Sequence, residues 1–428
     1  MDSIPANRVN TGETKRIAVV GSGISGLSAA YYLSRLYRVT LFECHDYIGG
    51  HTHTHNVTVD DKSLRVDTGF IVHNDRTYPY FSQLINELGC RWRPTEMSFS
   101  VKSSTVEYNG HNLNTLFCQR RNLLNPRFLR MVKDILRFNK QAHRLDSVDK
   151  GLTIGEYLDQ HQYSAVFANQ YLLPMAAAIW STGTAPVRAF PVDALTRFFK
   201  HHGLLDLKNR PQWRVMEGGS DAYIEPMLRT IGETRTRCAV LSVKRQPEHV
   251  SVSYSLDDRI QETEHFDQIV LATHSDQALA LLADPSDAEV SVLSQMKYAP
   301  NSVTLHTDAS IMPKRKLAWA SWNYLLDTDT SQASLTYDMN RLQHLETDVP
   351  VLVTLNDHGR IATNKVIRKI NYAHPFYDHQ MLDSQSRWGE VSGINRTHYA
   401  GAYWRDGFHE DGVFSALRVC DQLGVGLC

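Results

Sequence analysis

The sequence predicts an α/β fold that starts with a parallel sheet, and three adjoining observations predict it. Residues 17–20 are a short apolar run, which is typical of a buried parallel strand. The pattern G-x-G-x-x-G follows at residues 21–26 and opens an Ala- and Leu-rich helical run that ends near Leu36. A second apolar run at 39–42 ends in Glu43, about 20 residues after the glycine loop. Strand, loop, helix and acid together predict a Rossmann-like dinucleotide site.

Each glycine of the loop has a separate physical task. Gly21 permits a tight turn, Gly23 lets a pyrophosphate approach the main chain, and Gly26 lets the helix pack closely on the strand. The helix begins at Ile24 and Ser25, where free N–H groups and the positive end of the helix dipole favour a phosphate.

The residues after the second strand indicate which dinucleotide fits. Glu43 is predicted to bind a ribose hydroxyl, and Cys44 and His45 follow it where an arginine would bind a 2′-phosphate. NADP is therefore disfavoured at this site.

Composition excludes several classes of protein. The length of 428 residues allows two or three domains, and a net charge of −1 argues against a general nucleic-acid binder. Six cysteines without C-x-x-C spacing predict neither a zinc cage nor a disulfide framework, as in a reducing compartment. Gly and Ser interrupt the apolar run after Lys15-Arg16, so it is not interpreted as a signal peptide, and no stretch reaches the roughly 18 apolar residues of a membrane span. We expect a cytoplasmic protein, soluble or peripheral at the inner face of a membrane.

Nucleotide-domain features return twice further along the chain. A buried-type strand is expected at 266–273, and a strand followed by a helix at 398–423. We therefore expect a disordered leader (1–15), a discontinuous nucleotide domain (16–90, 213–290 and 392–428), and an inserted mixed α+β substrate domain (91–212 and 291–391).

A basic amphipathic helix is predicted after Asn125-Pro126, which supply a cap and a first-turn proline. Its apolar face has Phe128, Val132, Ile135 and Ala142, and its opposite face has Arg130, Lys133, Arg137, Lys140 and Arg144. The helix either lies on an anionic membrane or is a solvated face docked on its own domain, and the second interpretation is favoured.

Longer motifs resemble one family. They are residues 67–74 (DTGFIVHN), 119–123 (QRRNL), 274–279 (HSDQAL), 319–324 (WASWNY) and 401–412 (GAYWRDGFHEDG). With Gly49-Gly50, they resemble the FAD-dependent amine oxidase superfamily over residues 15–423. Within it, the chain is similar to a branch of NAD/FAD-binding proteins that accompany cyclopropane-fatty-acid synthases.

The resemblance implies FAD. It also implies that the motif at 401–412 lies at the flavin end of the cofactor, and because no cysteine adjoins this flavin-end motif, FAD is expected to be held noncovalently. His51 stands where many members have arginine, so the pyrophosphate charge is expected to be less well compensated. The implied FAD contacts are Gly21, Gly23, Ile24, Ser25, Gly26, Glu43, Cys44, Gly49, Gly50, His51, Thr52, Gly69, Phe70, Val243, Ala272, Thr273, Gly401, Ala402, Asp411, Gly412 and Val413.

Catalytic candidates are weaker. An aromatic wall over the flavin is predicted from Tyr403 and Trp404, which directly follow Gly401-Ala402, although any single aromatic residue is more often core. His409 is the preferred histidine because it lies in the flavin-end motif, and Lys297 is a loose candidate for the amine oxidase lysine. Further aromatic and histidine candidates are Trp180, Trp322, Tyr324, His274, His306 and His398.

A metal site is not expected. His51, His53 and His55 alternate and would share one face of a strand, but no carboxylate pattern completes a ligand set.

The function expected from these patterns and from the family resemblance is an FAD-dependent oxidoreductase that transfers hydride from a substrate C–H bond to the flavin, with acyl chains of membrane lipids as substrate. Two alternatives stay open. One is a conventional amine oxidase, and the other is a non-catalytic, flavin-bearing partner of a lipid methyltransferase.

Overall fold

The computed structural model describes residues 14–143, 151–180, 182–206, 209–257, 260–326 and 333–426. A five-stranded sheet in the order β10-β2-β1-β14-β20 has all its strands parallel. These strands are β1 (Arg16–Val20), β2 (Arg38–Phe42), β10 (Glu233–Arg235), β14 (Gln268–Leu271) and β20 (Thr397–Tyr399). The predicted α/β fold is confirmed, and the three chain segments of the expected nucleotide domain all contribute strands. Of the predicted leader, residues 1–13 lie outside the described ranges.

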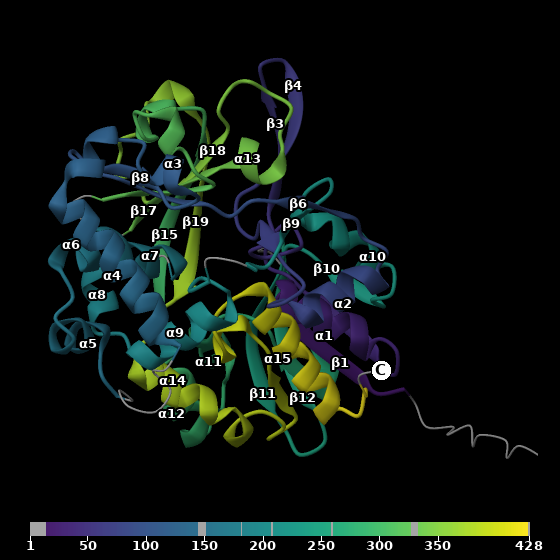
Figure 1. Ribbon diagram of the computed structural model, residues 1–428. Coiled ribbons are helices and arrows are strands. Elements are labelled where there is room, and N and C mark those ends of the chain that lie inside the picture. Colours follow the sequence, from purple (N-terminus) through teal and green to yellow (C-terminus); the bar gives the residue numbers. More distant parts are fainter. Residues whose placement is uncertain are drawn as a thin grey trace, which may run out of the picture.

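Two helices cover one side of this sheet. Helix α1 (Ile24–Leu33) follows β1 and is buried over nine of its ten residues, so it is apolar nearly all round. Helix α15 (His409–Gln422) packs alongside α1, as the lower right of Figure 1 shows. It begins at His409, three residues before the predicted start at Gly412.

A three-stranded antiparallel sheet adjoins the parallel one. It consists of β11 (Cys238–Arg245), β12 (Val250–Leu256) and β13 (Ile260–Phe266). Strand β13 is not predicted, because its sequence IQETEHF lacks the apolar alternation on which a strand prediction depends.

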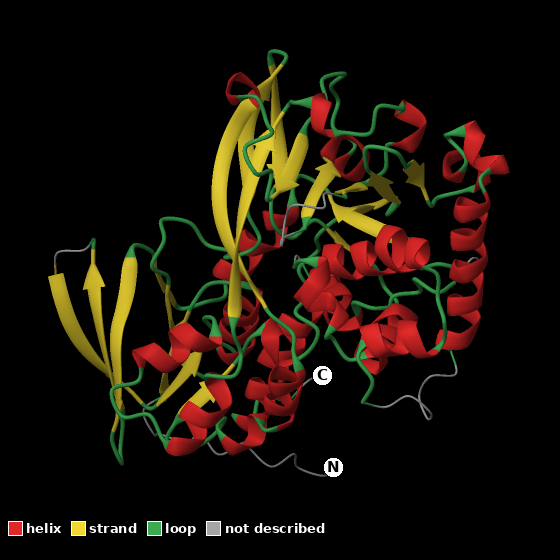
Figure 2. Ribbon diagram, turned by 90° about the vertical axis from the view of Figure 1, so that its left-hand side faces the viewer, coloured by secondary structure: helices red, strands yellow, loops and turns green. Residues whose placement is uncertain are grey.

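The second large unit is a mixed seven-stranded sheet in the order β19-β15-β18-β17-β16-β7-β8, with its long strands β15 and β19 standing out in Figure 2. Its strands are β7 (Phe99–Lys102), β8 (Glu107–Asn109), β15 (Tyr298–His306), β16 (Trp322–Leu325), β17 (Ser334–Asp338), β18 (Leu352–Leu355) and β19 (Val366–Pro375). Strands β7 and β16 pair in parallel although more than two hundred residues separate them. The boundaries between the two expected domains stay a prediction.

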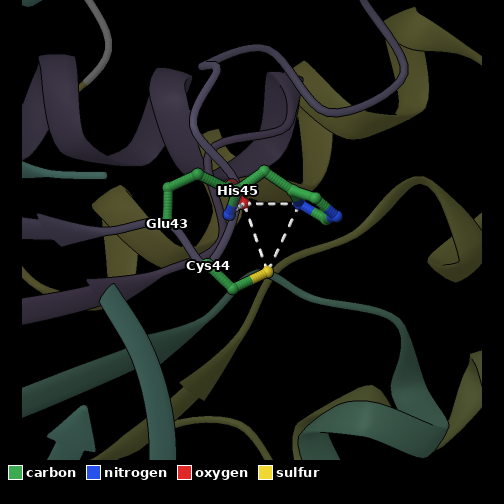
Figure 3. Close-up of side chains that lie close together, drawn as sticks. All are labelled: Glu43, Cys44 and His45. Atoms are coloured by element: carbon green, nitrogen blue, oxygen red, sulfur yellow. Dashed lines mark hydrogen bonds and ion pairs between the residues drawn. The ribbon is translucent and has the colours of Figure 1, made fainter. Parts of the chain in front are cut away.

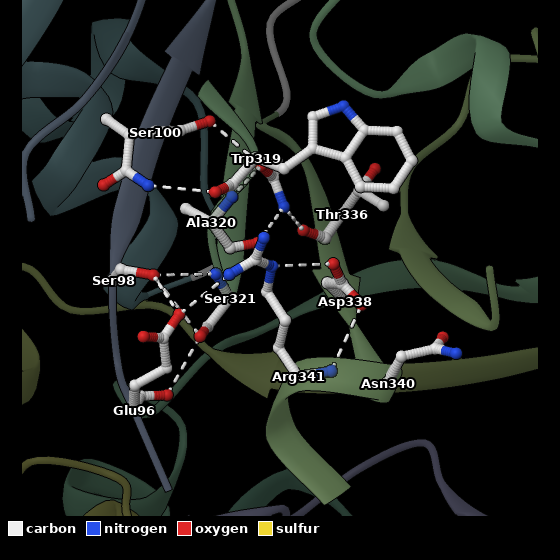
Figure 4. Close-up of polar contacts among 12 residues, drawn as sticks. Glu96, Ser98, Ser100, Trp319, Ala320, Ser321, Thr336, Asp338, Asn340 and Arg341 are labelled. Atoms are coloured by element: carbon white, nitrogen blue, oxygen red, sulfur yellow. Dashed lines mark hydrogen bonds and ion pairs between the residues drawn. The ribbon is translucent and has the colours of Figure 1, made fainter. Parts of the chain in front are cut away.

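The motif at 319–324 connects these two strands (Figure 4). The Asn323 side-chain amide donates to the carbonyl oxygens of Ala320 (2.6 Å) and Thr336 (3.2 Å), and its oxygen accepts from Ser100 Oγ (3.0 Å). Every polar atom of this buried side chain is therefore used to join neighbouring strands, which gives the motif a structural role.

A helical region precedes β9 (Trp213–Met216). It consists of α3 (Leu113–Leu116), η1 (Arg120–Leu124), α4 (Pro126–Ala142), α5 (Ile154–Gln160), α6 (Ala165–Phe167), η2 (Ala168–Leu172), α7 (Leu173–Ile179), α8 (Thr184–Arg188) and α9 (Val192–His201). The predicted cap of α4 is confirmed, because the Asn125 side chain accepts from the Arg127 and Phe128 N–H groups.

The remaining elements connect these units, and β3 and β4 pair as an antiparallel hairpin. Ser220 begins a 3₁₀ turn. No helix in the described ranges combines the length and the apolar character that a bilayer crossing requires. The connecting elements are β3 (Thr54–Val59), β4 (Lys62–Asp67), β5 (Val72–His73), α2 (Pro79–Glu87), β6 (Trp92–Thr95), η3 (Ser220–Tyr223), α10 (Ile224–Leu228), α11 (Ser275–Leu281), α12 (Asp287–Leu293), η4 (Ala309–Ile311), η5 (Lys316–Ala318), α13 (Met339–Gln343), η6 (Thr363–Lys365), α14 (His379–Ser386), η7 (Trp388–Glu390) and η8 (Ala402–Trp404).

Candidate cofactor site

The glycine loop between β1 and α1 has the geometry that its sequence predicts. A Cβ on Gly21 (φ +98°) would lie 2.8 Å from the Ala272 carbonyl oxygen, and one on Gly26 would lie 1.8 Å from the Gly21 carbonyl oxygen. A Cβ on Gly23 would meet nothing within 4 Å. Gly21 and Gly26 are therefore needed to close the loop, whereas Gly23 faces open space through which a ligand can reach the main chain.

Glu43 ends β2 beside this loop. Its Oε2 accepts from the Ser22 N–H (3.0 Å) and Ser22 Oγ (2.6 Å), and its Oε1 accepts from the His45 N–H (2.9 Å). Burial opposes ionisation of the carboxyl, but the hydrogen bonds from Ser22 and His45 outweigh it and lower the pKa of Glu43 below its usual value. A fixed, ionised carboxylate thus lies beside the glycine loop, and its contact with a ribose hydroxyl stays a prediction.

Glu43, Cys44 and His45 also form a compact group, drawn in Figure 3. In the part of the chain that the structure describes, it is the one set of three side chains with metal-ligand atoms within 4.8 Å of one another. The three residues are consecutive, and Glu43 Oε1 already accepts from the His45 N–H. We assign the group to a hydrogen-bonded turn at the ribose position.

The Gly49-Gly50 turn lies directly against the glycine loop. The Gly49 N–H donates to the Ser22 carbonyl oxygen (3.1 Å), and a Cβ on Gly50 would lie 2.9 Å from Gly23 Cα. Gly69 packs on His51, the residue after Gly50, because a Cβ on Gly69 would lie 2.0 Å from the His51 carbonyl oxygen. The Gly49-Gly50 turn therefore packs on the glycine loop, and Gly69 packs on the residue that follows this turn.

Thr52 joins this region to the last helix. Its hydroxyl contacts the Tyr223 hydroxyl (2.5 Å) and His409 Nε2 (2.9 Å), and the His409 ring stacks on Phe70 with 3.6 Å between ring centroids. Burial lowers the pKa of His409 well below its usual value, so the ring is neutral. Its Nε2 is engaged by two hydroxyls, and its catalytic role stays a prediction.

Helix α15 starts next to the start of α1. A Cβ on Gly412 would lie 2.6 Å from Ile24 Cγ2, so only glycine allows this approach. The Asp411 carboxylate accepts from the Phe408 N–H (2.9 Å) and caps the helix, while Val413 is buried behind it. Burial, and then the nearby Asp406 carboxylate, raise the pKa of Asp411 well above its usual value. Two helix N-termini, each with a positive dipole end, thus converge on the same place.

An aromatic group adjoins this end. Tyr403 and Trp404 are both buried, with ring centroids 5.2 Å apart, and the Tyr403 hydroxyl and Trp404 Nε1 have no hydrogen-bond partner within the described residues. Trp180 Nε1 and the Tyr377 hydroxyl are likewise buried and unsatisfied, with their rings 6.2 Å apart. Since buried polar groups are nearly always bonded, each of these two pairs has donors available to a ligand.

The other candidates lie elsewhere. Trp322 packs on Tyr337 in the seven-stranded sheet, and Tyr324 is buried in the same strand. His306 is bonded to Thr354, and His398 to Gln422, so both have structural partners. Lys297 is exposed. His274 stacks on Tyr298, whose ring lies 6.4 Å from that of Tyr403, which places it beside the aromatic group.

His374 is a residue that sequence reasoning missed. It lies on β19 with its Nε2 3.4 Å from His51 Nε2, and its Nδ1 contacts the Asn301 side-chain amide (3.1 Å). No motif marks His374, because only the pairing of β19 with β15 brings it to the glycine-rich turn.

The predicted adenine contact shows a further difference. Val243 is fully buried, and its carbonyl oxygen already accepts from the Ala283 N–H (2.9 Å). Val240 is partly exposed and stands nearer to Cys238, whose N–H donates to the Glu43 carbonyl oxygen (2.9 Å). Val240 is therefore a further candidate for the adenine side, and the role of Val243 stays a prediction.

These observations fit an elongated dinucleotide. Open space lies over Gly23, an ionised carboxylate stands at one end, and unsatisfied aromatic donors stand at the other. The residues present therefore fit FAD, and the individual FAD contacts stay predictions.

Comparisons with known proteins agree with this fit. The family model of flavin containing amine oxidoreductases matches residues 24–344. A candidate protoporphyrinogen oxidase from Exiguobacterium sp. 255-15 superposes with a TM-score of 0.69 and 17% identity over 96% of this chain and 99% of its own. A fatty acid isomerase from P. acnes that produces CLA superposes with a TM-score of 0.67 and 15% identity, over 95% of this chain and 98% of its own. Putrescine oxidase bound to putrescine superposes with a TM-score of 0.65 and 16% identity, over 96% of this chain and 99% of its own.

At these identities the structural likenesses show the fold. A comparison with curated protein sequences found no match.

Proposed function

This chain belongs to the flavin containing amine oxidoreductase family, and from that premise we propose that it binds FAD noncovalently and oxidises a C–H bond of a long-chain acyl group. Members of the amine oxidase superfamily are FAD-dependent oxidoreductases. The noncovalent mode and the acyl substrate are the proposed steps.

The glycine loop is the observation that carries the cofactor assignment. Gly21 and Gly26 close the loop against Ala272, and Gly23 leaves its main chain accessible. The N-terminus of α1 has no side-chain cap, so its first N–H groups and its dipole are available to a pyrophosphate.

Bound FAD would supply the hydride acceptor, at its N5, and a second acceptor would reoxidise it. Glu43 would hold the ribose, and the converging N-termini of α1 and α15 would stabilise negative charge. Tyr403 and Trp404 would exclude water from the reacting end, which hydride transfer requires more than it requires an acid or base.

An apolar substrate suits the aromatic group. Trp180 packs on Phe190 (4.8 Å) and Phe198 (5.1 Å), and Phe198 in turn stacks on Phe408 (5.1 Å). These side chains give Trp180 and Tyr377 an apolar surrounding that would accommodate a hydrocarbon chain. The resemblance to proteins that accompany cyclopropane-fatty-acid synthases suggests oxidation or desaturation near a methylated or cyclopropanated position of a phospholipid chain.

Amine oxidation is the second candidate, because putrescine oxidase shares this fold. The side chain of Lys297, the one candidate for the lysine found in many amine oxidases, is exposed. A third possibility is a flavin-bearing partner of a lipid methyltransferase without substrate turnover.

Anaerobic mixing distinguishes the three. Lipid extract that contains methylated or cyclopropanated phospholipids should bleach the flavin absorption band, whereas putrescine and monoamines should not. Bleaching by amines alone would contradict the acyl substrate in favour of amine oxidation. A band unchanged by every substrate, with a stable methyltransferase complex, would contradict turnover.

A further inference from the structure

Exposed leucines are concentrated in one segment of this chain. Of the eleven large hydrophobic side chains that are exposed in the described ranges, five lie between residues 113 and 136. Leu124 is 89% exposed and Leu113 is 73% exposed. The remaining three are Leu123, Leu129 and Leu136. Single exposed leucines need no explanation, but a cluster marks an interaction site.

Helix α4 arranges leucines and lysines on its outward face. Leu129, Lys133, Leu136 and Lys140 follow one another at spacings of four, three and four residues, so they form a single stripe. The opposite face of the helix packs inward through Phe128, Met131 and Phe138, which are buried. The outward leucines are therefore additional to the core-facing stripe and have no structural task in the fold. Helix α4 lies at the front of Figure 1 and along the right-hand edge of Figure 2, so this stripe is on the outside of the molecule.

The charge around these leucines has one sign. Asp134 is the sole acid between residues 110 and 143, and it is 1% exposed and accepts from Arg130 and the Ser164 N–H. Arg127, Lys133 and Lys140 are exposed and make no ion pair within the described part of the chain. Since the whole chain has a net charge of −1, this is a strong local excess of positive charge.

We propose that these residues form a surface that binds an anionic lipid bilayer. This basic leucine surface consists of Leu113, Leu123, Leu124, Leu129 and Leu136 with Arg120, Arg121, Arg127, Arg130, Lys133 and Lys140. Leucines on a convex helix enter the boundary between headgroups and acyl chains, while the neighbouring cations contact anionic headgroups. A nucleic acid would satisfy the cations but leave five leucines uncovered.

The surface stands close to the proposed reaction site. Phe138 on the inner face of α4 packs on Phe199 of α9, with ring centroids 6.4 Å apart. The adjacent Phe198 stacks on Phe408 at the start of α15 (5.1 Å). One helix thus separates the basic leucine surface from the aromatic group. The link to a lipid substrate rests on the proposed function, whereas the surface itself does not.

Vesicle flotation of the full-length protein tests this inference. The vesicles contain either phosphatidylcholine alone or equal parts of phosphatidylcholine and phosphatidylglycerol. We expect binding to the anionic vesicles, release as salt rises from about 0.1 M to about 0.5 M, and weaker binding to phosphatidylcholine alone. The double variant Lys133→Glu and Lys140→Glu should have a partition coefficient lower by about 25-fold or more, since each basic residue contributes about fivefold.

A second variant tests the leucines. Leu124→Ser with Leu129→Ser should lower partitioning by about tenfold, because each burial of a leucine side chain is favourable. The matched control is Leu36→Ser with Lys365→Glu and Lys369→Glu, which changes one exposed leucine and two exposed lysines elsewhere and should bind like the wild type.

Three results would overturn the inference. One is wild-type protein that does not float with anionic vesicles, and another is test variants that bind like the control. The third is a self-association in solution that the leucine variant abolishes while vesicle binding is absent, which would indicate a protein contact. Flavin absorbance of the same samples reports separately on the cofactor, so failure here is distinct from failure of the proposed chemistry.

Discussion

A Cβ on Gly412 would lie only 2.9 Å from Ser25 Oγ, so the first turn of α15 touches the first turn of α1. These helices are separated by nearly four hundred residues, yet their N-termini point at one region. Because the positive ends of helix dipoles favour anions, we expect this contact to favour a pyrophosphate and a negatively charged reduced flavin.

Gly412→Val should therefore separate the two helices and weaken FAD binding by at least about tenfold, because the new side chain would overlap Ile24 and Ser25. The measurement is a titration of apoprotein with FAD. Gly389→Val is the control, since a Cβ there meets nothing within 4 Å. Equal FAD affinity for both variants would show that the helix contact is unimportant for the cofactor.

Glu43→Gln should weaken FAD binding by about tenfold to a hundredfold, because a hydrogen bond to a charged group contributes about 1.5–3 kcal/mol. The glutamine also removes the charge that the hydrogen bonds from Ser22 and His45 stabilise. Calorimetric titration of FAD into apoprotein measures the change. The exposed Glu225→Gln serves as control, and an unchanged affinity for Glu43→Gln would refute the ribose assignment.

The buried ion pair of Arg245 and Glu289 predicts a stability effect. Both side chains are at most 4% exposed, and Arg245 Nη1 lies 2.8 Å from Glu289 Oε1. Glu289→Gln leaves the buried guanidinium with the partly exposed Asp284 carboxylate as its remaining ionic partner, so the loss of unfolding free energy in urea should be about 3 kcal/mol, the lower end of the range for a broken buried pair. The exposed ion pair of Arg387 and Glu390 gives the control, because Glu390→Gln should cost at most about 1 kcal/mol of unfolding free energy. Similar losses in both variants would contradict this difference.

Glu289 also gives the protein a dependence on acid. Burial opposes its ionisation, but Arg245 lowers the pKa of Glu289 from 4.5 to about 2. A lowered folded pKa stabilises the protein above the unfolded pKa of 4.5 and loses this effect as the pH falls towards 2. The difference in unfolding free energy between wild type and Glu289→Gln should therefore shrink through this window. A pH-independent difference would refute the assignment.

Asp67 should make the unfolding free energy change with pH in the opposite direction. Burial raises the pKa of Asp67 from 3.8 to about 6, although Thr54 and Ser220 donate to its carboxylate. The folded protein then binds more protons than the unfolded chain between pH 3.8 and 6, so stability falls as pH rises through this window. Between pH 3.8 and 6 the unfolding free energy of the wild type should therefore fall relative to that of Asp67→Asn. Outside this window the two free energies should change with pH in the same way. A parallel course throughout would count against the raised pKa.

The first ninety residues show what a sequence can predict. Strand β1, the glycine loop, α1, β2 and Glu43 follow one another along the chain, so local spacing already determines their relation. Gly412 was predicted as a contact through family resemblance alone, because its closeness to Ser25 depends on how the sheet brings the last segment back.

Contacts made by long-range pairing were not predictable in this way. His374 reaches His51 through the β15–β19 pairing, and Arg245 reaches Glu289 through the packing of α12 against the rest of the domain. Neither pair lies at a spacing that identifies it. Strand β13 was missed because its polar residues fit an outer strand whose identity only its neighbour β12 decides.

The FAD content of purified protein is the most direct test of the central claim, and Gly23→Val sharpens it. Gly23 has an ordinary φ of −65° and nothing within 4 Å of its Cβ position, so valine there should leave the fold and the melting temperature nearly unchanged while blocking the pyrophosphate. Wild-type protein should be yellow and release about one FAD per chain on acid treatment, and the variant should be colourless with the same circular dichroism. A colourless wild type that cannot be reconstituted with FAD, or a variant with full FAD content, would contradict the account.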